Sequence, residues 1–137
     1  MVCIKCGSRT KVVNSRLQKR SNQIWRRRLC NNCSFIFTSE EFIDFSTVWR
    51  VKEDSATNYA YFYRDKLYLS IYKSLKHRND AFLDATELCH LVMRLLEKLA
   101  TNGILTDKDI ALTIASVFDN FDKAASSHYR AYHPKYF

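Results

Sequence analysis

The chain has few residues that break regular structure and no long apolar segment. Its 137 residues include two glycines and one proline, so long irregular loops are not expected. No apolar run is long enough to span a membrane, and Lys5 and Arg9 interrupt any signal-peptide pattern. With 47% hydrophobic and 26% charged residues, the composition predicts a folded protein that stays in the cytoplasm.

Acidic residues are missing from the first 38 positions, where nine lysines and arginines lie. The other 13 of the 22 basic residues are balanced by all 14 acidic residues, which follow residue 38. The formal net charge of +8 is therefore concentrated at the N-terminus. This asymmetry predicts a polyanion-binding module joined to a nearly neutral one, with a merely solvated basic surface as the alternative.

The sequence pattern predicts an α+β protein with two domains, residues 1–42 and residues 43–137. Short strand-like stretches precede the boundary, at residues 11–16, 24–29 and 35–38, and Ser21-Asn22 is the expected turn between the first two. Two more strands are expected at residues 47–52 and 58–62, joined by a polar turn at residues 53–57. These two strands form a β-hairpin that caps a bundle of helices.

Three or four amphipathic helices are expected after the hairpin. The first covers residues 64–76, with leucine and isoleucine at spacings of four. The second ends before Asn102-Gly103, and Thr106 begins the third. The expected buried positions of the second helix are Leu88, Leu91, Val92, Leu95, Leu96 and Leu99. Those of the third are Ile110, Ile114, Val117, Phe118 and Phe121.

Four cysteines form two Cys-x-x-Cys pairs, Cys3 with Cys6 and Cys30 with Cys33. Two such pairs on two hairpins supply the four thiolates of a tetrahedral zinc site, so we predict a structural Zn²⁺ in a zinc ribbon. Two disulfides or a redox pair are the alternatives, but a reducing cytosol and two copies in a basic sheet favour zinc. All four ligands are protein thiolates, so no hydrolytic chemistry is expected.

The second cysteine pair directly follows a basic strand. Alternation along this strand places Arg26 and Arg28 on one face and Arg27 on the other, with Lys11 and Arg16 on the neighbouring strand. These five side chains are the predicted DNA-binding residues, because guanidinium and ammonium groups bind phosphates and guanine edges. Trp25 either fills the small core or stacks on a base.

The chain resembles the NrdR family of bacterial transcriptional repressors of ribonucleotide reductase genes, which join a zinc ribbon to a nucleotide-binding ATP-cone. The resemblance rests on the two Cys-x-x-Cys pairs, on residues 10–17 (TKVVNSRL), on residues 26–29 (RRRL) and on Phe37-Thr38. In the second half, Val51-Lys52 and residues 62–67 (FYRDKL) resemble the ATP-cone more weakly. The resemblance implies a DNA-binding repressor that acts on double-stranded promoter DNA and is associated with the nucleoid.

The resemblance also implies ATP and dATP as effectors and assembly into a homo-oligomer. The implied nucleotide-binding residues are Val51, Lys52, Lys66, Lys73 and Arg78. A carboxylate at Glu53 would cost binding energy unless it points away from the phosphates, and strand alternation allows this because Lys52 and Glu53 face opposite sides. Solvated lysines on a helix surface are the alternative for these residues.

No nucleophile, general-base pair or phosphate-binding loop is present, so no enzymatic activity is expected. Three other functions remain open: an RNA-binding zinc ribbon, a DNA-binding protein whose ATP-cone serves only for oligomerisation, and an adaptor for acidic proteins.

Overall fold

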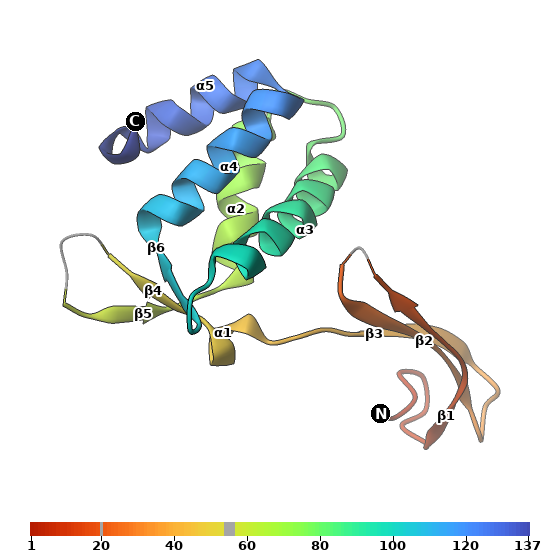
Figure 1. The fold of residues 1–137 in the computed structure, drawn as a ribbon. Helices are drawn as coiled ribbons and strands as arrows, with labels where there is room; N and C mark the ends of the chain where they lie inside the picture. The colour runs from red at the N-terminus through yellow and green to blue at the C-terminus, as the bar shows by residue number, and fades with distance from the viewer. Residues whose placement is uncertain (20, 54–56) are drawn as a thin grey trace. The chain divides into compact units, whose positions relative to one another are not determined.

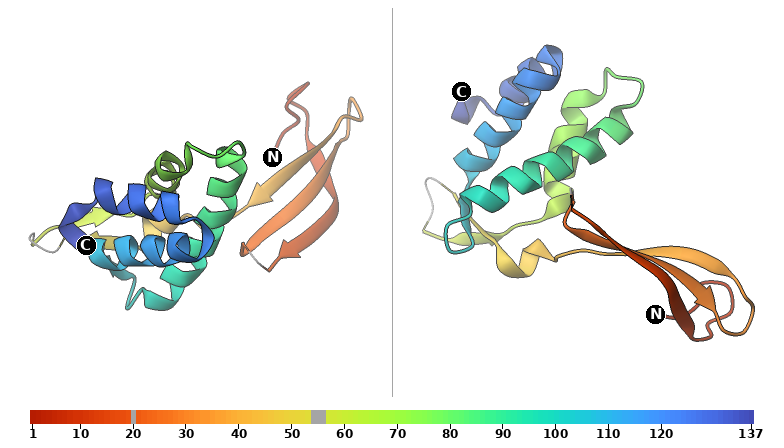
Figure 2. Two further views of the ribbon diagram at one scale, coloured as in Figure 1. Left: turned by 90° about the horizontal axis from the view of Figure 1, so that it is seen from above. Right: turned by 45° about the vertical axis from the view of Figure 1, so that its right-hand side comes forward.

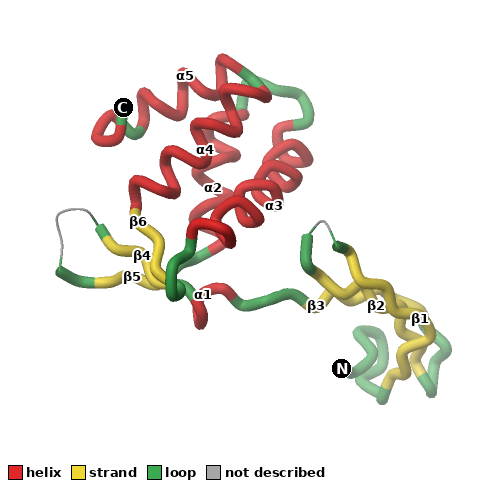
Figure 3. Tube along the Cα trace, viewed as in Figure 1, coloured by secondary structure: helices red, strands yellow, loops and turns green. Residues whose placement is uncertain are grey.

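The computed structural model describes residues 1–19, 21–53 and 57–137, and the chain forms two compact units, Met1–Ile43 and Asp44–Phe137. The predicted α+β class is confirmed: strands and loops make up the first unit, whereas helices dominate the second (Figure 1; Figure 3). No helix among the described residues is long and apolar enough to cross a membrane.

The first unit is built on a three-stranded antiparallel sheet in the order β1-β2-β3, visible as a twisted ribbon in Figure 2. Its strands are β1 (Thr10–Gln18), β2 (Gln23–Cys30) and β3 (Ile36–Glu41). The predicted turn precedes β2, and Asn22 adopts a positive φ of 51° there. The only hydrophobic residues buried among those described in this unit are Cys3 and Cys30, each 2% exposed. A sheet without an apolar core needs another source of stability.

The second unit combines a small sheet with a layer of helices that lies to one side of it (Figure 1). Its sheet has the order β5-β4-β6. The elements are α1 (Phe45–Val48), β4 (Arg50–Lys52), β5 (Tyr59–Tyr61), α2 (Arg64–Leu75), α3 (Ala81–Leu99), β6 (Ile104–Thr106), α4 (Asp107–Phe121), α5 (Lys123–Tyr132) and the 3-10 helix η1 (Pro134–Tyr136).

The predicted hairpin is present, but its first strand is shorter than expected. Thr47 belongs to α1 and not to a strand, because Asp44 caps this short helix. The Asp44 carboxylate accepts hydrogen bonds from the Ser46 N–H at 3.0 Å and from the Ser46 hydroxyl at 2.6 Å. Residues 54–56 of the predicted turn lie outside the described residues.

A third strand, β6, pairs in parallel with β4 and was not predicted. It spans three residues, too few to show a periodic pattern. Gly103 leads into it with a φ of +75°, and a Cβ atom there would lie 2.7 Å from the Val48 carbonyl oxygen. The Gly103 carbonyl accepts a hydrogen bond from the Arg50 N–H at 2.8 Å. Only glycine fits this close backbone approach.

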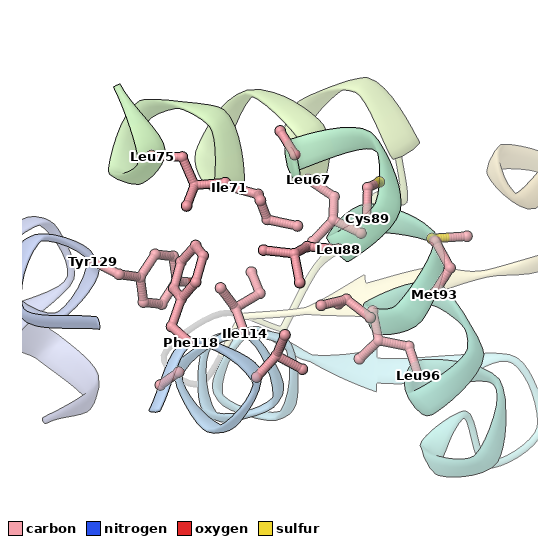
Figure 4. Packing of buried hydrophobic residues seen from close by; sticks show 14 of the residues in the cluster. Leu67, Ile71, Leu75, Leu88, Cys89, Met93, Leu96, Ile114, Phe118 and Tyr129 are labelled. Atoms are coloured by element: carbon pink, nitrogen blue, oxygen red, sulfur yellow. The ribbon is translucent and has the colours of Figure 1, made fainter. Parts of the chain in front are cut away.

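The helices enclose the hydrophobic core of the second unit, where the side chains of α2, α3, α4 and α5 converge (Figure 4). Ile71, Leu75 and Leu96 are fully buried, and Phe118 is 1% exposed. Three predicted core positions are wrong, because Leu91, Leu99 and Phe121 are 42%, 48% and 41% exposed. Leu91 is exposed on α3, Leu99 ends α3 and lines a groove together with Leu112 of α4, and Phe121 is the last residue of α4.

Candidate functional site

Two matching backbone turns present the four cysteines. The Cys3 N–H donates to the Ser8 carbonyl at 2.8 Å, and the Cys30 N–H donates to the Phe35 carbonyl at 2.9 Å. Each turn contains a residue with positive φ four positions after its first cysteine, Gly7 at 72° and Ser34 at 57°. The two Cys-x-x-Cys segments therefore form two similar knuckles, which is how a zinc ribbon surrounds its metal.

The sulfur atoms of these knuckles converge. The Sγ atoms of Cys3 and Cys33 lie 3.7 Å apart, those of Cys6 and Cys30 lie 3.5 Å apart, and all four lie within 4.8 Å of one another. These distances far exceed the roughly 2.0 Å of a disulfide. A tetrahedron with Zn–S bonds of about 2.3 Å has edges of about 3.8 Å, so the four thiols fit a structural Zn²⁺ closely.

Hydrogen bonds around the sulfurs favour the thiolate form that a metal requires. The N–H groups of Asn32 and Cys33 each donate to Cys30 Sγ at 3.4 Å, and the Lys5 N–H donates to Cys3 Sγ at the same distance. The Cys33 N–H and the Asn32 N–H lower the pKa of Cys30. Hydrogen bonds from Ser8 lower the pKa of Cys6 to about 6. Negative charge is thus stabilised at Cys6 and Cys30. The Phe35 N–H also lowers the pKa of Cys33, but burial and hydrogen bonds with the neighbouring thiols outweigh it and raise that pKa to about 11.

The register of the sheet divides the predicted DNA-binding residues between two faces. We define the inner face as the one that carries Cys30, together with Arg26 and Arg28 of β2. Arg26 pairs with Glu41 at 3.1 Å, and the Arg28 Nε donates to the Ser39 hydroxyl at 2.8 Å. Both arginines are half-buried and already bound to β3.

The opposite, outer face carries Arg27, and directly paired residues place Lys11 and Arg16 of β1 on it as well. Lys11 pairs with Leu29 and Arg16 pairs with Trp25. These three cations are exposed, and none of them forms an ion pair with another described residue. Trp25 is half-buried on this same face.

A second candidate site is a cleft of about 310 Å³ in the second unit, between β4, β5 and the helices α2, α4 and α5. Aromatic side chains line it: Tyr61, Phe62, Tyr63, Tyr129 and Tyr136. Lys66 is the only lysine or arginine among the described lining residues, and its Nζ lies 5.4 Å from the centre of the Tyr63 ring.

Two carboxylates, Glu53 and Asp107, also line the cleft. Ser70 and His133 approach each other there, with 3.3 Å between the hydroxyl and Nε2. Burial and the charge of Lys73 lower the pKa of His133, so its ring is neutral near pH 7. Burial raises the pKa of Tyr129, which keeps its hydroxyl protonated. The cleft thus has much aromatic surface and little positive charge.

The predicted nucleotide-binding residues are only partly brought together. Val51 and Lys66 line the cleft, whereas Lys52, Lys73 and Arg78 are not among its described lining residues. Of the pair Lys52 and Glu53, it is Glu53 that lines the cleft. Arg78 instead forms ion pairs with Asp84 at 2.6 Å and with Asp122 at 2.9 Å, near the end of α2.

No sequence signal indicated that Ser70, Asp107 and His133 would line this cleft. They lie in segments far apart in the chain, and only the packing of the helices brings them together. For Tyr129 the sequence does contain a signal: Ala125 and Tyr129 are four residues apart, which is the spacing of one face of a helix. Both residues are buried in the structure.

Comparisons with known proteins point to one family. Residues 1–41 match the sequence profile described as "Transcriptional repressor NrdR-like, N-terminal domain". The chain is 31% identical over 148 aligned residues to the transcriptional repressor NrdR of Finegoldia magna, which covers 92% of this chain and 93% of that protein. It is 34% identical over 104 residues to NrdR of Streptococcus gordonii, covering 75% of this chain and 63% of that protein.

Proposed function

Because the chain belongs to the NrdR family of transcriptional repressors, we propose that it represses transcription by binding double-stranded promoter DNA through its zinc ribbon. The observation that carries this proposal is the four-thiolate centre together with the charge around it: the first 38 residues of the chain contain no acidic side chain. A metal-held sheet with exposed arginine and lysine side chains suits the phosphate backbone of a duplex. The protein would then act in the cytoplasm at the nucleoid.

The proposed targets are ribonucleotide reductase genes, which the family relationship suggests. The test is a DNA-binding assay with duplex fragments from the host's own reductase promoters and with unrelated promoters of matched length. We expect tighter binding to the reductase fragments at the same salt concentration. Equal binding to every fragment would support a general polyanion-binding protein instead.

We further propose that ATP and dATP bind the cleft of the second unit and control assembly into a homo-oligomer. Its tyrosines offer surface for stacking a base, and Lys66 offers a charge for a phosphate. Two carboxylates beside one lysine repel a triphosphate, so the expected affinity is low. Calorimetric titration with each nucleotide, with the DNA assay repeated in its presence, tests this proposal.

The same carboxylates favour a second candidate function for this unit. With Glu53 and Asp107 facing the cleft and Arg78 held by Asp84 and Asp122, the unit would only oligomerise and would not sense nucleotide. Absence of heat with millimolar ATP and dATP, measured on folded protein, would favour this alternative. Sedimentation with and without nucleotide then reports the assembly state directly.

A further inference from the structure

The outer face of the zinc-ribbon sheet carries a row of hydrogen-bonding side chains across all three strands. Asn14 of β1 pairs directly with Arg27 of β2, and Arg27 pairs directly with Thr38 of β3. Directly opposed residues in antiparallel strands project from the same face. All three residues are exposed, so the row projects three polar groups into solvent.

A bulge in β1 creates this row. The pairing steps from Val12 opposite Arg28 to Asn14 opposite Arg27, which leaves Val13 as the extra residue. Without the bulge, Val13 would lie opposite Arg27, and Asn14 would lie on the inner face. The bulge also brings Lys11 and Arg16 to the same face, although simple alternation would separate them. One inserted residue thus gathers polar and basic side chains of β1 beside Arg27.

The inner face is poorly suited to contact a duplex. In β3 the inner residues Phe37 and Ser39 are half-buried, whereas the outer residues Ile36 and Thr38 are exposed. The inner Arg26 and Arg28 are engaged by Glu41 and Ser39, and the Arg26 Nε is buried without a hydrogen-bond partner among the described residues, out of reach of a phosphate. A cation that already has partners gains less from a phosphate than a free one.

We propose that the outer face enters a groove of duplex DNA, with the row Asn14–Arg27–Thr38 contacting base edges and Lys11 and Arg16 contacting phosphates. This inference rests on the proposed DNA-binding function and adds which residues determine sequence preference. Arginine bonds bidentately to guanine, asparagine to adenine, and threonine contacts the methyl group of thymine. The backbones of β1 and β3, the two strands at the ends of the row, lie about 10 Å apart, and the major groove is roughly 12 Å wide. Glu40 lies on this face at the β3 end of the row that contains Trp25 and Arg16, so phosphate contact in that row is confined to its β1 end.

The first test places the same negative charge on each face. Thr38→Asp and Ser15→Asp change exposed hydroxyl residues that project from opposite faces of the sheet. The full-length variants are titrated with the duplex sequences that the wild-type protein enriches from a random-sequence duplex library. We expect Thr38→Asp to weaken binding by about 10-fold or more and Ser15→Asp by about 2-fold or less. Bound zinc and circular dichroism confirm that both variants are folded.

The second test separates base contacts from phosphate contacts. Asn14→Ala is expected to relax the selected sequence at one base pair and to leave the salt dependence of binding unchanged. Lys11→Ala is expected to leave the selected sequence unchanged and to reduce the salt slope by about 0.9. A competing single-stranded or duplex RNA of matched length is expected to displace the DNA poorly.

Several results would overturn the inference while the proposed function stands: equal losses from the two aspartates, an unchanged selection with Asn14→Ala, or wild-type binding that enriches no sequence. Preferential binding of the RNA competitor, or no binding to any duplex by zinc-loaded wild-type protein, would overturn the proposed function together with this inference.

Discussion

The two compact units of this protein reach stability by different means. In the second unit, side chains from four helices fill a continuous core, and residues such as Ile71 and Leu96 are fully buried. The first unit buries two cysteines and no large hydrophobic side chain among its described residues. In strand β1, every residue after Thr10 is exposed. About 40 residues without an apolar core do not fold stably on their own, so metal coordination supplies the missing free energy.

This difference shows in the surfaces that each unit can present. Because the metal and not a core holds the sheet, both of its faces are available for charged side chains, and nine basic residues occur in its first 38 positions. In the helical unit, the apolar faces of the helices are buried in the core. Its cleft lies where these helices meet the small sheet. The metal thus frees the first unit to present a charged surface to a partner.

The largest expected effect comes from removing a zinc ligand. Cys30→Ser should unfold the first unit, because structural zinc contributes on the order of 10 kcal/mol, while the helical unit should remain folded. Cys89→Ser is the matched control, since Cys89 is fully buried in the helical core and is not one of the clustered thiols. It should retain zinc and destabilise only the helical unit. Elemental analysis measures the zinc content of both variants, and two-dimensional NMR shows which unit remains folded. A wild-type protein that contains no zinc when purified without chelators would contradict this prediction.

A core substitution tests the opposite side of the comparison. Phe118→Ala should lower the free energy of unfolding of the helical unit by about 3–5 kcal/mol, because the ring is 1% exposed and its removal leaves a cavity. Zinc content and DNA binding should be unchanged if the first unit folds independently. Thermal unfolding followed by circular dichroism gives the decrease in stability, and a loss of zinc in this variant would show that the two units are coupled.

The basic strand should contribute to the DNA affinity chiefly through Arg27, which lies on the outer face. Replacing Arg26, Arg27 and Arg28 by alanine should weaken duplex binding by at least about 100-fold, or roughly 3 kcal/mol. The salt slope should fall by about 0.9 for each phosphate that the variant no longer contacts. Replacing Lys76, Lys98 and Lys123 by alanine removes the same charge from exposed positions of the helical unit. Similar reductions in affinity for the two triple variants would mean that net charge alone drives binding.

Nucleotide binding in the cleft should depend on Lys66, the one lysine among its described lining residues. Lys66→Ala should weaken ATP binding by about 10-fold or more, because a charge-assisted hydrogen bond contributes about 1.5–3 kcal/mol. Glu53→Gln should have the opposite effect, because it removes a negative charge that faces the phosphates. Calorimetry with ATP and dATP measures both variants, and identical affinities in all three proteins would show that the nucleotide binds elsewhere.

The smallest expected effect concerns a helix cap. The Thr106 hydroxyl accepts the Asp109 N–H at 3.0 Å, and the Asp109 carboxylate accepts the Thr106 N–H at 3.1 Å, which forms a capping box at the start of α4. Thr106→Ala should lower the free energy of unfolding of the helical unit by about 1 kcal/mol. Urea titration resolves this difference, and zinc content should not change.

Several features of the fold and of the candidate site follow from local sequence. The Cys-x-x-Cys spacing, the Ser21-Asn22 turn, the alternation of Arg26, Arg27 and Arg28 and the cap at Thr106 each depend on a few neighbouring residues. Their geometry is therefore written into the local chain. The structure confirms the fold class, and it brings the four predicted thiols together. The prediction from sequence missed β6, because a strand of three residues is too short to show a periodic pattern. It also placed Leu91 in the core, because periodicity identifies an apolar stripe on a helix but does not show how much of that stripe a neighbouring helix covers.

The sequence by itself determined that this protein has a four-thiolate centre and a positively charged first unit, because ligand type, ligand spacing and charge do not depend on long-range packing. The tertiary structure alone decided which side chains share a surface. The bulge at Val13 moves Asn14 and Arg16 to the face of Arg27, and the pairing of β4 with β5 and β6 brings Glu53, and not Lys52, to the cleft. Both outcomes depend on pairing between segments that are distant in the chain, where a shift of one residue reverses the direction in which a side chain points.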